Sequence, residues 1–476
     1  MAKDYPIYLA GRWETSAERL EVRNPYGGAV VGVTCNASAE QLESAIQAAV
    51  AAFQTTRKLP SYERERILRH IAQGIEARKD ELARLITLQS GKPIRDASAE
   101  VTRAVITFNT AAEEAKRMGG ETIPLDWAGG SKGRLGITRR FPIGPIAGIS
   151  PFNFSLNLAA HKVAPAIASG NPIVLKPPSQ APLTMLEVAR LAEEAGLPKG
   201  ALSVLPMGRA VGDRLVTDER FALLSFTGSP AVGWDMKARA GKKKVILELG
   251  GNAGAIVDSG CDLDHAVERL AVGSFAYSGQ VCISVQRIYV VRDIFDEFSR
   301  RFLERVRRIK VGDPLDPATD IGPMIDEAAA RKAEEWVREA VSMGARVLAG
   351  GVRKGSVIEP TVLADADPQS KVCRLEAFSP LVNLFAVSSF EEAVAQVNAS
   401  AYGLQAAVFT RDLLHTVHAF QNLDVGAVII NDSPAYRIDH MPYGGVKESG
   451  FGREGLRYAI EEMTELKLLV IPGALE

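Results

Sequence analysis

Apolar positions in the first part of the chain recur at the spacing of one helix face. Ser38-Ala-Glu-Gln41 has the form of a capping box, which predicts that an alanine-rich helix begins there. A second helix is expected over residues 61–89 and a third over residues 94–118, because Gly91-Lys-Pro93 interrupts the pattern between them. The apolar positions that define the second helix are Ile67, Ile71, Ile75, Leu82 and Ile86.

After Pro145 the pattern changes to short apolar runs that alternate with helical stretches. Repeated strand–helix units of this kind build a parallel sheet with helices on both faces, and such sheets bind ligands at the carboxyl ends of their strands. The apolar runs predict strands over residues 146–150, 172–176, 202–205, 223–226 and 245–249. The stretches between them predict helices over residues 156–168, 183–195, 210–216 and 231–240.

A second strand–helix series follows the pair Gly250-Gly251, which we interpret as a hinge. Two other segments, residues 134–141 and 465–471, are extended and belong to neither series, so we expect them to form a small projecting sheet. The predicted fold is α/β, with two doubly wound parallel-sheet domains and a small β arm. The second series has predicted strands over residues 255–257, 288–291, 346–348, 407–409 and 427–430 and predicted helices over residues 263–277, 295–310 and 326–343.

The composition narrows the class of protein without identifying it. A chain of 476 residues is long enough for about two to four domains. The net charge is -1, with 24% charged residues, so nothing favours nucleic acid as a partner. No apolar run is long enough to span a bilayer, and the N-terminal residues lack an apolar signal core. We therefore expect a cytoplasmic protein with no membrane partner.

The cysteines and histidines indicate neither a disulfide framework nor a metal site. No C-x-x-C pair occurs, and free thiols fit a reducing compartment. His415 and His418 form H-x-x-H, but no third ligand accompanies them, so we expect no metal. The four cysteines are Cys35, Cys261, Cys282 and Cys373.

Three residues supply chemistry when they are considered together. Cys282 offers a thiol that can attack a carbonyl carbon. Glu248 ends an apolar strand, where partial burial would raise its pKa and suit it to act as a general base. Asn153 follows another predicted strand, from which its carboxamide can donate to an oxyanion. Considered alone, Cys282 also fits a small buried hydrophobic residue, Glu248 fits a salt-bridged residue at the end of a strand, and Asn153 fits a turn residue.

Several segments resemble motifs of the aldehyde dehydrogenase superfamily, and the layout of the chain fits that family from end to end. The resemblance implies that the Cys282 thiolate adds to an aldehyde while Asn153 and the backbone N–H of Cys282 hold the oxyanion. It implies that hydride then leaves to a nicotinamide ring and that Glu248 activates the water that hydrolyses the thioester. The segments are Ser150-Pro-Phe-Asn153, Lys176-Pro-Pro178, Phe226-Thr-Gly-Ser229, Glu248-Leu-Gly-Gly251, Gly279-Gln-Val-Cys282, Glu376-Ala-Phe378 and Pro442-Tyr-Gly-Gly445.

The resemblance also implies how the chain is divided. Residues 1–123 and 143–250 correspond to a Rossmann-like NAD(P)-binding domain, and residues 251–435 correspond to a catalytic domain. Residues 124–142 and 455–476 correspond to an oligomerisation arm, which implies a homodimer or a homotetramer.

A cofactor, NAD or NADP, is implied at the carboxyl ends of the first sheet. Lys176 ends a strand, where a cation can reach the adenosine ribose, and Ser229 opens a helix whose free N–H groups favour a pyrophosphate. By resemblance, Glu376 binds the nicotinamide ribose and Phe378 packs near the ring, with two glycines on the adenine side. The implied residues are Ser150, Pro151, Phe152, Lys176, Ser179, Gly208, Gly212, Ser229, Leu249, Glu376 and Phe378.

Two departures from the family pattern fall at this site. The chain has Ser379 before proline, where the family usually has glycine. Three residues after Lys176, many NAD-preferring members carry a glutamate that binds the ribose hydroxyls, whereas this chain has Ser179. Because a carboxylate would repel a 2′-phosphate and a hydroxyl can donate to one, we expect NADP to be accepted. The G-x-G-x-x-G at residues 450–455 follows no predicted strand, and we interpret it as a loop or an oligomer contact.

Cationic or nearly cationic side chains are expected around the substrate. Arg437 suits a phosphate or phosphonate through bidentate donation, whereas Arg287 also fits a structural role. Each candidate alone also fits a surface or salt-bridged residue. As a group they resemble family members that oxidise small anionic aldehydes, such as non-phosphorylating glyceraldehyde-3-phosphate, phosphonoacetaldehyde and lactaldehyde dehydrogenases. The candidates are Arg103, His161, Arg287, Arg437 and His440.

Three alternatives stay open beside NAD(P)-dependent oxidation of a small anionic aldehyde to its acid. A CoA-acylating dehydrogenase would pass the acyl group to CoA, but Glu248 would then be unnecessary. A cysteine hydrolase or transferase without a redox step would not need the segments around Lys176 and Ser229. A non-catalytic relative would not need Cys282 and Asn153 together with Glu248.

Overall fold

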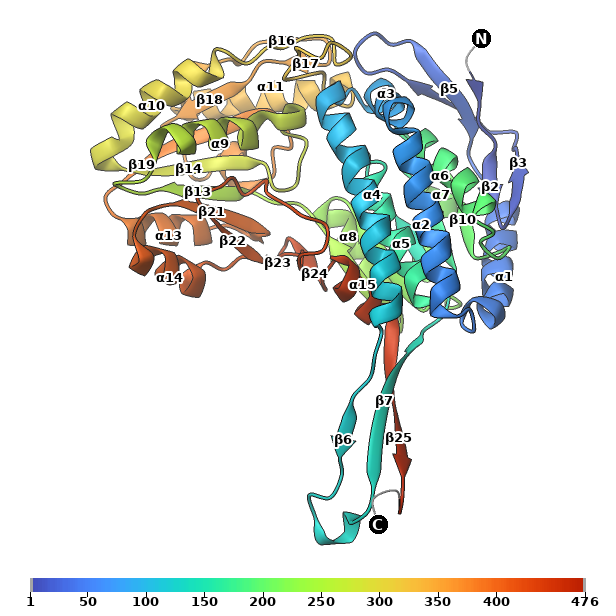
Figure 1. The fold of residues 1–476 in the computed structure, drawn as a ribbon. Coiled ribbons are helices and arrows are strands. Elements are labelled where there is room, and N and C mark those ends of the chain that lie inside the picture. The colour runs from blue at the N-terminus through green and yellow to red at the C-terminus, as the bar shows by residue number, and fades with distance from the viewer. Residues whose placement is uncertain (1–2, 474–476) are drawn as a thin grey trace.

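The computed structural model describes residues 3–473 and shows two lobes, with an arm that projects from one of them (Figure 1). Each lobe contains a mostly parallel sheet covered by helices, so the predicted α/β fold with two such domains and a small β arm is confirmed. Residues 1–2 of the expected cofactor domain and residues 474–476 of the expected arm lie outside the described residues.

The first lobe is built on an eight-stranded sheet with the order β24-β12-β11-β8-β9-β10-β2-β3. Its five central strands, β12 to β10 in that order, are parallel and are those expected from the apolar runs. The antiparallel edge strands have two or three residues each, too few for a pattern to reveal them. The strands are β2 (Ile7–Leu9), β3 (Arg12–Glu14), β8 (Ile146–Ile149), β9 (Ile173–Lys176), β10 (Leu202–Val204), β11 (Leu223–Thr227), β12 (Lys244–Glu248) and β24 (Gly450–Phe451).

The strand order of this sheet reverses beside β8. From β8 the chain proceeds outward through β9 and β10, and it then returns to the other side of β8 to form β11 and β12. The loops after β8 and β11 therefore diverge at the carboxyl ends of the strands. A crevice at such a reversal is the usual ligand site of a doubly wound sheet.

Helices cover both faces of this sheet (Figure 1). Ser38 caps the first of them with the predicted capping box. The single helix expected over residues 61–89 is wrong: Arg78 leaves the helical conformation (φ -110°, ψ 24°), and its side chain bonds Glu187. The helices of this lobe are α1 (Ala39–Thr56), α2 (Ser61–Ala77), α3 (Lys79–Ser90), α4 (Ile94–Arg117), α5 (Asn157–Ser169), α6 (Leu183–Glu194), α7 (Arg209–Thr217), α8 (Pro230–Arg239) and α15 (Leu456–Glu462).

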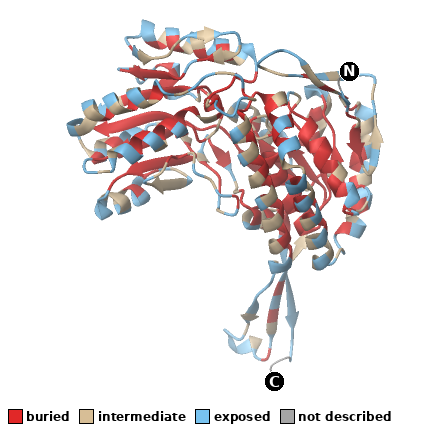
Figure 2. Ribbon diagram, turned by 45° about the horizontal axis from the view of Figure 1, so that its top comes forward, coloured by how far each residue is buried: buried red, intermediate tan, exposed pale blue. Residues whose placement is uncertain are grey.

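Helix α5 is buried along its whole length, in a lobe whose buried residues concentrate in its central helices and strands (Figure 2). A helix that is buried all round is expected to be apolar, yet α5 carries His161 and Lys162. Because buried charged or polar side chains need partners, these two residues mark a polar site beside the sheet.

The second lobe is built on a seven-stranded sheet with the order β15-β18-β19-β14-β13-β21-β22. Strand β15 is antiparallel to β18, and the other pairs are parallel. Strands β18 and β19 are continuous apolar runs, which a pattern does not distinguish from buried helix, and they are not among the predicted strands. The strands are β13 (Ala253–Val257), β14 (Val285–Val291), β15 (Arg346–Ala349), β18 (Thr361–Ala364), β19 (Leu381–Val387), β21 (Gln405–Phe409) and β22 (Ala427–Ile430). The helices are α9 (Leu263–Phe275), α10 (Arg292–Val306), α11 (Glu327–Ser342), α12 (Lys371–Arg374), α13 (Phe390–Asn398) and α14 (Leu413–Asn422).

The arm is a three-stranded sheet with the order β25-β7-β6 that extends away from the first lobe (Figure 1). Helix α15 lies in a segment expected to belong to the arm, but it packs against α4 and α5. Within residues 3–473, no helix has the length and apolar character needed to cross a membrane. The arm strands are β6 (Thr122–Pro124), β7 (Leu135–Pro142) and β25 (Thr464–Ile471).

Short elements complete the fold around these layers. Strands β1 (Lys3–Asp4), β5 (Val30–Cys35) and β4 (Arg19–Arg23) form a further three-stranded sheet. Two-stranded sheets join β16 (Arg353–Lys354) to β17 (Val357–Ile358) and β20 (Tyr402–Gly403) to β23 (Val446–Lys447). The 3-10 turns are η1 (Gly129–Ser131) and η2 (Ala276–Gly279).

Candidate active site

A cavity of about 460 Å³ opens at the carboxyl ends of the first sheet, where the strand order reverses. Its walls come from the loops after β8 and β11, from the residues after β12 and from segments of the second lobe, so it lies between the lobes. The thiol candidate Cys282 and the amide candidate Asn153 both line it. The predicted residues in its walls are Ser150, Pro151, Phe152, Asn153, Lys176, Ser179, Ser229, Leu249, Cys282, Glu376 and Phe378.

The loop before Cys282 has a constrained backbone. Helix α9 ends earlier than expected, because Tyr277 and Ser278 have left-handed φ angles of 47° and 55°. That conformation is unfavourable for residues other than glycine. The hydroxyls of these two residues donate to the backbone carbonyls of Ser90 in the first lobe (3.1 Å) and Gly322 in the second (2.8 Å). The loop is therefore anchored to both lobes.

Gly279 continues this turn with φ 65°, and a Cβ at that position would lie 2.0 Å from the carbonyl oxygen of Ser379. A glycine is thus required for the Cys282 loop to approach the segment that carries Glu376 and Phe378. Ser379, where the family usually has glycine, is accommodated with its hydroxyl buried and without a hydrogen-bond partner among residues 3–473.

The Cys282 sulfur has a neighbour that the sequence does not indicate. Its Sγ lies 3.0 Å from Oη of Tyr443. Burial raises the pKa of Cys282 to about 12, while the Tyr443 hydroxyl and the charge of Arg437 act in the opposite direction. From the first lobe, Asn153 Nδ2 donates to the carbonyl of Gln280 at 3.0 Å, close to Cys282 in the chain. The structure therefore brings the predicted thiol and amide together.

Glu248 is the last residue of β12 and is buried. Neither of its carboxylate oxygens has a hydrogen-bond partner in the described part of the chain. Burial, followed by the negative charge of Glu454, raises the pKa of Glu248 well above its usual range. A carboxyl group with a raised pKa can gain and lose a proton near neutral pH, which suits a general base.

A buried charge network lies beside Glu248. Lys162, on α5, donates to Thr227 at 2.7 Å and to Glu454 at 3.2 Å. Arg437 donates to the other oxygen of Glu454 at 3.1 Å. Burial alone would raise the pKa of Glu454, but Lys162 and Arg437 hold it at about 2. Glu454 is therefore ionised and stabilises both cations inside the protein.

Glu454 belongs to the G-x-G-x-x-G segment at residues 450–455, which we interpreted as a loop or an oligomer contact. The structure adds a short strand to it: Gly450 and Phe451 form β24 and pair with β12, and Gly450 lies opposite Glu248. The rest of the segment carries Glu454 to the charge network beside Glu248.

Two of the five expected substrate residues bind Asp439, a buried carboxylate that the sequence does not indicate, while a third, Arg437, pairs with Glu454. Arg103 and His161 bind Asp439 at 2.8 Å each. Burial and the charge of Arg437 lower the pKa of His161, so its imidazole is neutral at pH 7. Arg437 also stacks on Tyr443, with its guanidinium carbon 3.6 Å from the ring centre.

The other two expected substrate residues are placed elsewhere. Arg287 is buried beneath the second sheet, where it donates to Asn252 and to the carbonyls of Gln396 and Val397. Since its donors are used within the core, Arg287 holds the fold together and does not reach the cavity. His440 is exposed and forms no hydrogen bond or ion pair with any residue from 3 to 473.

The cavity walls also fit a dinucleotide. Ser229 is the N-cap of α8, and no side chain caps the N–H groups of that helix, which leaves them for a phosphate. Lys176 and Ser179 line the same cavity. Gly212 lies beside Lys176, since a Cβ there would be 3.3 Å from Lys176 Cδ. Gly208 caps α7 nearby, and neither glycine is part of the cavity wall.

The nicotinamide end of the expected site carries a carboxyl group. Glu376 Oε1 accepts a hydrogen bond from the N–H of Gly251 at 2.9 Å. Burial raises the pKa of Glu376 to about 7. Phe378 packs edge-to-face on Phe152, with ring centres 6.0 Å apart. Lys332, on α11, also lines the cavity and is absent from the sequence-based set.

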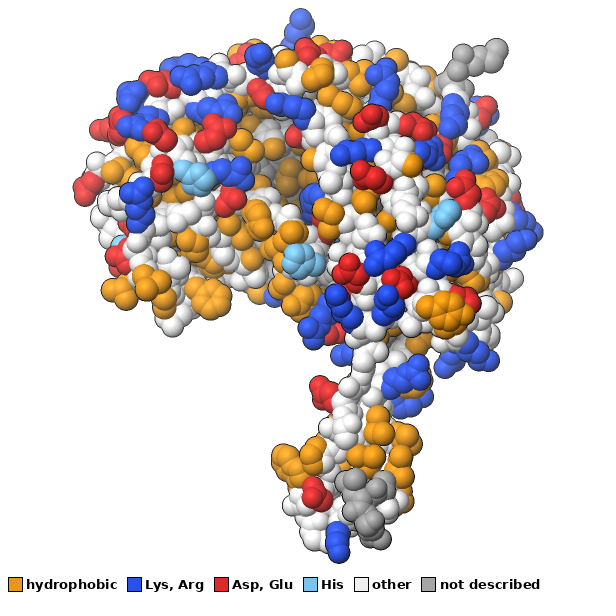
Figure 3. Space-filling view, viewed as in Figure 1, with side chains coloured by type: hydrophobic (Ala, Val, Ile, Leu, Met, Phe, Trp, Pro, Cys, Tyr) orange, Lys and Arg blue, Asp and Glu red, His pale blue; other side chains and the backbone are white. Residues whose placement is uncertain are grey.

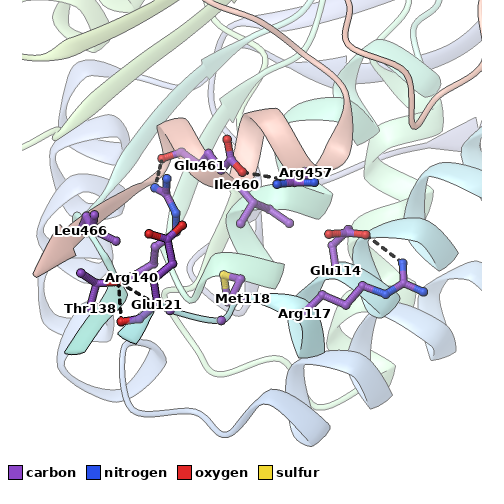
Figure 4. A pocket seen from close by; sticks show the side chains of 12 residues that line it. Glu114, Arg117, Met118, Glu121, Thr138, Arg140, Arg457, Ile460, Glu461 and Leu466 are labelled. Carbon is purple, nitrogen blue, oxygen red and sulfur yellow. Dashed lines mark hydrogen bonds and ion pairs between the residues drawn. The ribbon is translucent and has the colours of Figure 1, made fainter. Parts of the chain in front are cut away.

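A second cavity, of about 580 Å³, lies at the base of the arm (Figure 4). Two of its arginines are already paired with carboxylates, as the dashed lines show: Arg117 with Glu114 and Arg457 with Glu461. Arg140 donates to the carbonyl of Glu461 and to the hydroxyl of Thr464. Each arginine of this cavity therefore already has an acceptor within residues 3–473.

Possible metal ligands do not cluster in residues 3–473, where no group of three or more His, Cys, Asp or Glu could hold an ion. His415 instead binds Asp258 at 2.7 Å and stacks on Phe390. All four cysteines are free thiols.

Similarity to known proteins agrees with this geometry. The profile of the aldehyde dehydrogenase family matches residues 13–469. The chain therefore belongs to the aldehyde dehydrogenase family and is an oxidoreductase that acts on aldehydes with NAD or NADP. The resemblance found in the sequence motifs is confirmed.

Individual relatives match over nearly the full chain. Over 470 residues, 98% of each chain, the protein is 44% identical to 3-sulfolactaldehyde dehydrogenase from Priestia aryabhattai. The structure resembles aldehyde dehydrogenase 21 from Physcomitrella patens in complex with the reaction product succinate (TM-score 0.98, 47% identity, 99% of both chains). It also resembles glyceraldehyde-3-phosphate dehydrogenase from Methanocaldococcus jannaschii complexed with NADP (TM-score 0.92, 41% identity, 96% of this chain and 100% of that one).

Proposed function

We propose that this enzyme oxidises a small aldehyde that carries an anionic group, such as a phosphate, phosphonate, sulfonate or carboxylate. The observation that carries the proposal is the buried charge network beside Glu248 and Cys282. Three cations pair there with two ionised carboxylates, the charge of Arg437 reaches the Cys282 sulfur, and Glu248 has a raised pKa that favours its neutral form. The cations are Arg103, Lys162 and Arg437, and the carboxylates are Asp439 and Glu454.

Arg437 supplies the anion contact in this proposal. Its side chain is only 6% exposed, and its Nε is buried without a partner in the described chain. A buried donor without an acceptor is unfavourable, so an anionic ligand oxygen would complete its hydrogen bonding. Two of the relatives support the same class of ligand, since one acts on sulfolactaldehyde and another binds succinate.

The chemistry follows from the residues already placed. Cys282, as a thiolate, attacks the aldehyde carbon, and the Asn153 amide and the Cys282 backbone N–H stabilise the oxyanion. Bound NAD(P) supplies the acceptor for the hydride. Glu248 then takes a proton from water, whose oxygen attacks the thioester carbon to release the acid and free Cys282.

A substrate panel tests this function. We expect Arg437→Ala to raise KM for an aldehyde ending in a carboxylate by about 10–100-fold, the value of a hydrogen bond to a charged group. An aldehyde of the same length ending in a methyl group should change far less. Arg300→Ala, which alters an exposed arginine on α10, is the control. An equal loss for both aldehydes would exclude Arg437 from anion binding.

We further propose that NADP is accepted, because Ser179 lines the cavity close to Lys176. Replacing Ser179 with glutamate should raise KM for NADP by about tenfold or more, since like charges in contact cost several kcal/mol. KM for NAD should change little. Ser179→Ala separates loss of the hydroxyl from the added charge, and equal effects of Ser179→Glu on both cofactors would contradict the assignment.

Two alternative functions would give different reaction products. A CoA-acylating enzyme would form product only with CoA present, and a redox-free cysteine hydrolase would form no NAD(P)H. We expect carboxylic acid and NAD(P)H in equal amounts without CoA, because the unpartnered carboxyl of Glu248 is placed to activate water.

We propose that the protein is a cytoplasmic homodimer or homotetramer. The free cysteines support a reducing compartment. The arm supports self-association, because hydrophobic side chains gather on its surface (Figure 3) and β25 leaves one edge unpaired. An exposed apolar edge strand is a ready site for pairing with another chain.

A further inference from the structure

We propose that Tyr443 is a catalytic residue: its hydroxyl donates a hydrogen bond to the Cys282 sulfur and stabilises the thiolate that attacks the aldehyde. The contact between Tyr443 Oη and Cys282 Sγ is 3.0 Å long. This inference rests on the proposed role of Cys282 as the nucleophile. The Tyr443 hydroxyl would act on the sulfur itself, whereas the Asn153 amide is proposed to act on the oxyanion.

The ring of Tyr443 is held in place on several sides. Tyr443 is 3% exposed. Its backbone N–H donates to the Glu454 carbonyl at 3.0 Å and its carbonyl accepts from the Glu454 N–H at 2.6 Å. The guanidinium of Arg437 covers one face of the ring at 3.6 Å. With the backbone and the ring both fixed, the hydroxyl cannot turn away from Cys282 without disturbing the charge network.

The surroundings favour donation from oxygen to sulfur. Among residues 3–473, Cys282 Sγ is the hydrogen-bond partner found for the Tyr443 hydroxyl. The Arg437 cation over the ring withdraws electron density and makes the hydroxyl a better donor. The titratable and charged groups whose fields reach the sulfur are Tyr443, Arg437, Glu376 and Glu248. Of these, the two carboxyl groups oppose ionisation of the thiol, so the tyrosine and the arginine are the groups that assist it.

The bond discriminates between the two forms of the sulfur. A neutral thiol is a weak acceptor, whereas a thiolate accepts a charge-assisted hydrogen bond that is about twice as strong as a neutral one. The Tyr443 hydroxyl therefore lowers the energy of the ionised form more than that of the resting form. Loss of this hydroxyl should make Cys282 harder to ionise while leaving the shape of the cavity unchanged.

The test measures the rate at which iodoacetamide alkylates Cys282 in the full-length protein as a function of pH. Tyr443→Phe should reduce the rate at pH 7 by about tenfold and raise the apparent pKa of Cys282 by about one unit. Tyr289→Phe is the matched control, because the Tyr289 hydroxyl is also buried but contacts Arg287, away from the cavity. An unchanged or faster rate in Tyr443→Phe would overturn the proposal. An unchanged rate would mean that the contact does not affect ionisation of the thiol, and a faster rate would mean that the sulfur is the donor.

A second substitution keeps the test valid if Tyr443→Phe folds poorly. Fluorotyrosine incorporated at position 443 retains the ring and the hydroxyl but makes the phenol more acidic and a stronger donor. It should shift the pKa of Cys282 downward, which a purely structural role of the ring would not do. No shift, or an upward shift, would refute donation to the sulfur.

Failure of the underlying function would look different. Cys282→Ser should abolish both the alkylation of this site and aldehyde oxidation, and retained oxidation would refute the nucleophile itself. If Cys282→Ser is inactive while Tyr443→Phe is alkylated at the normal rate, the role of Cys282 as nucleophile is supported and the proposed role of Tyr443 is refuted.

Discussion

Glu248 shows how the position of one side chain determines its chemistry. A carboxyl group buried without hydrogen-bond partners is costly in its ionised form, so its pKa rises. The same residue on an exposed strand end would be a permanently ionised acid. Its place at the carboxyl end of β12, opposite Gly450, makes it a proton acceptor that can also release the proton.

We predict that Glu248→Gln forms the thioester and then stalls. Glutamine has a similar shape but cannot take a proton from water, and loss of a general base typically lowers turnover by about 10²–10⁴-fold. Rapid mixing with aldehyde and NADP should show a burst of NADPH equal to the enzyme concentration, followed by slow release of acid. Glu219→Gln, on the surface, is the control. Normal steady-state turnover in Glu248→Gln would remove this residue from the mechanism.

The pH profile of deacylation should depend on neighbouring charges of opposite sign, among them Glu454 and Lys162. Glu248 works as a base when ionised, so the rate rises with pH through its raised pKa. Because the charge of Glu454 raises that pKa and Lys162 lowers it, Glu454→Gln should move the midpoint to lower pH and Lys162→Met to higher pH. Single-turnover hydrolysis of the acylated enzyme measures both shifts. Movement of both variants in the same direction would contradict this account.

At the scale of elements, a buried ion pair connects helix α4 to the loops of the active site. Lys92 and Glu100 bind each other and are almost fully buried. Glu100 also accepts from the N–H of Leu156 at 2.9 Å, in the segment that follows Asn153. Lys92 lies over the ring of Tyr277 at 4.5 Å, in the turn that precedes Cys282. The Lys92–Glu100 pair thus contacts both the segment that follows Asn153 and the turn that precedes Cys282.

We predict that Glu100→Ala lowers the free energy of unfolding by about 3–5 kcal/mol, because it leaves the Lys92 charge buried and unpaired. The double variant Lys92→Met/Glu100→Leu should recover most of this loss, since it removes both charges together. Urea denaturation followed by circular dichroism measures the change. Glu113→Ala, on the exposed side of α4, provides the control. A double variant as unstable as Glu100→Ala would show that the backbone contacts of Glu100 matter more than the ion pair.

The elements that the sequence predicts are helices with one apolar face and strands whose apolar runs alternate regularly with helical stretches. The five parallel strands of the first sheet fall within a residue or two of their expected bounds, because each apolar run is separated from the next by a helical stretch. The break at Arg78 is not predictable from periodicity, since the apolar spacing continues across it. The turn at Tyr277 and Ser278 depends on contacts with distant carbonyls, which no local pattern contains.

At the scale of the whole molecule, the site is assembled from segments that local patterns treat separately. The motifs led to Cys282, Asn153 and Glu248, but the partners of these residues come from far along the chain. Tyr443 and Glu454 lie inside segments that the motif analysis quoted, without their roles being visible. A local signal was the pair His161-Lys162, two polar residues in the middle of a largely apolar helix. Arg287, only five residues after Cys282, instead makes its hydrogen bonds within the core, in keeping with the structural role that we also considered for it.

The arm is the part of the molecule whose exposed edge strand is suited to pairing with a second chain. Strand β25 pairs with β7 on one side, and no strand within residues 3–473 pairs with its other edge. Its apolar side chains point to both faces and are exposed, with Leu466 at 55%, Leu468 at 49% and Leu469 at 57%. A soluble monomer rarely carries such a patch on an edge strand, whereas a subunit interface does.

We therefore predict that Leu468→Glu together with Leu469→Lys dissociates the oligomer, because each charge would lose water in a packed interface. Light scattering after size-exclusion chromatography should show the mass of one subunit, 51.2 kDa, instead of the two or four subunits that we propose for the wild type. Tyr62→Glu, which alters a 63% exposed side chain on α2, should leave the mass of the assembly unchanged. Because Cys282, Glu248 and Tyr443 all belong to one chain, the dissociated subunit should retain the alkylation of Cys282. An unchanged assembly in the double variant would show that subunits meet through another surface.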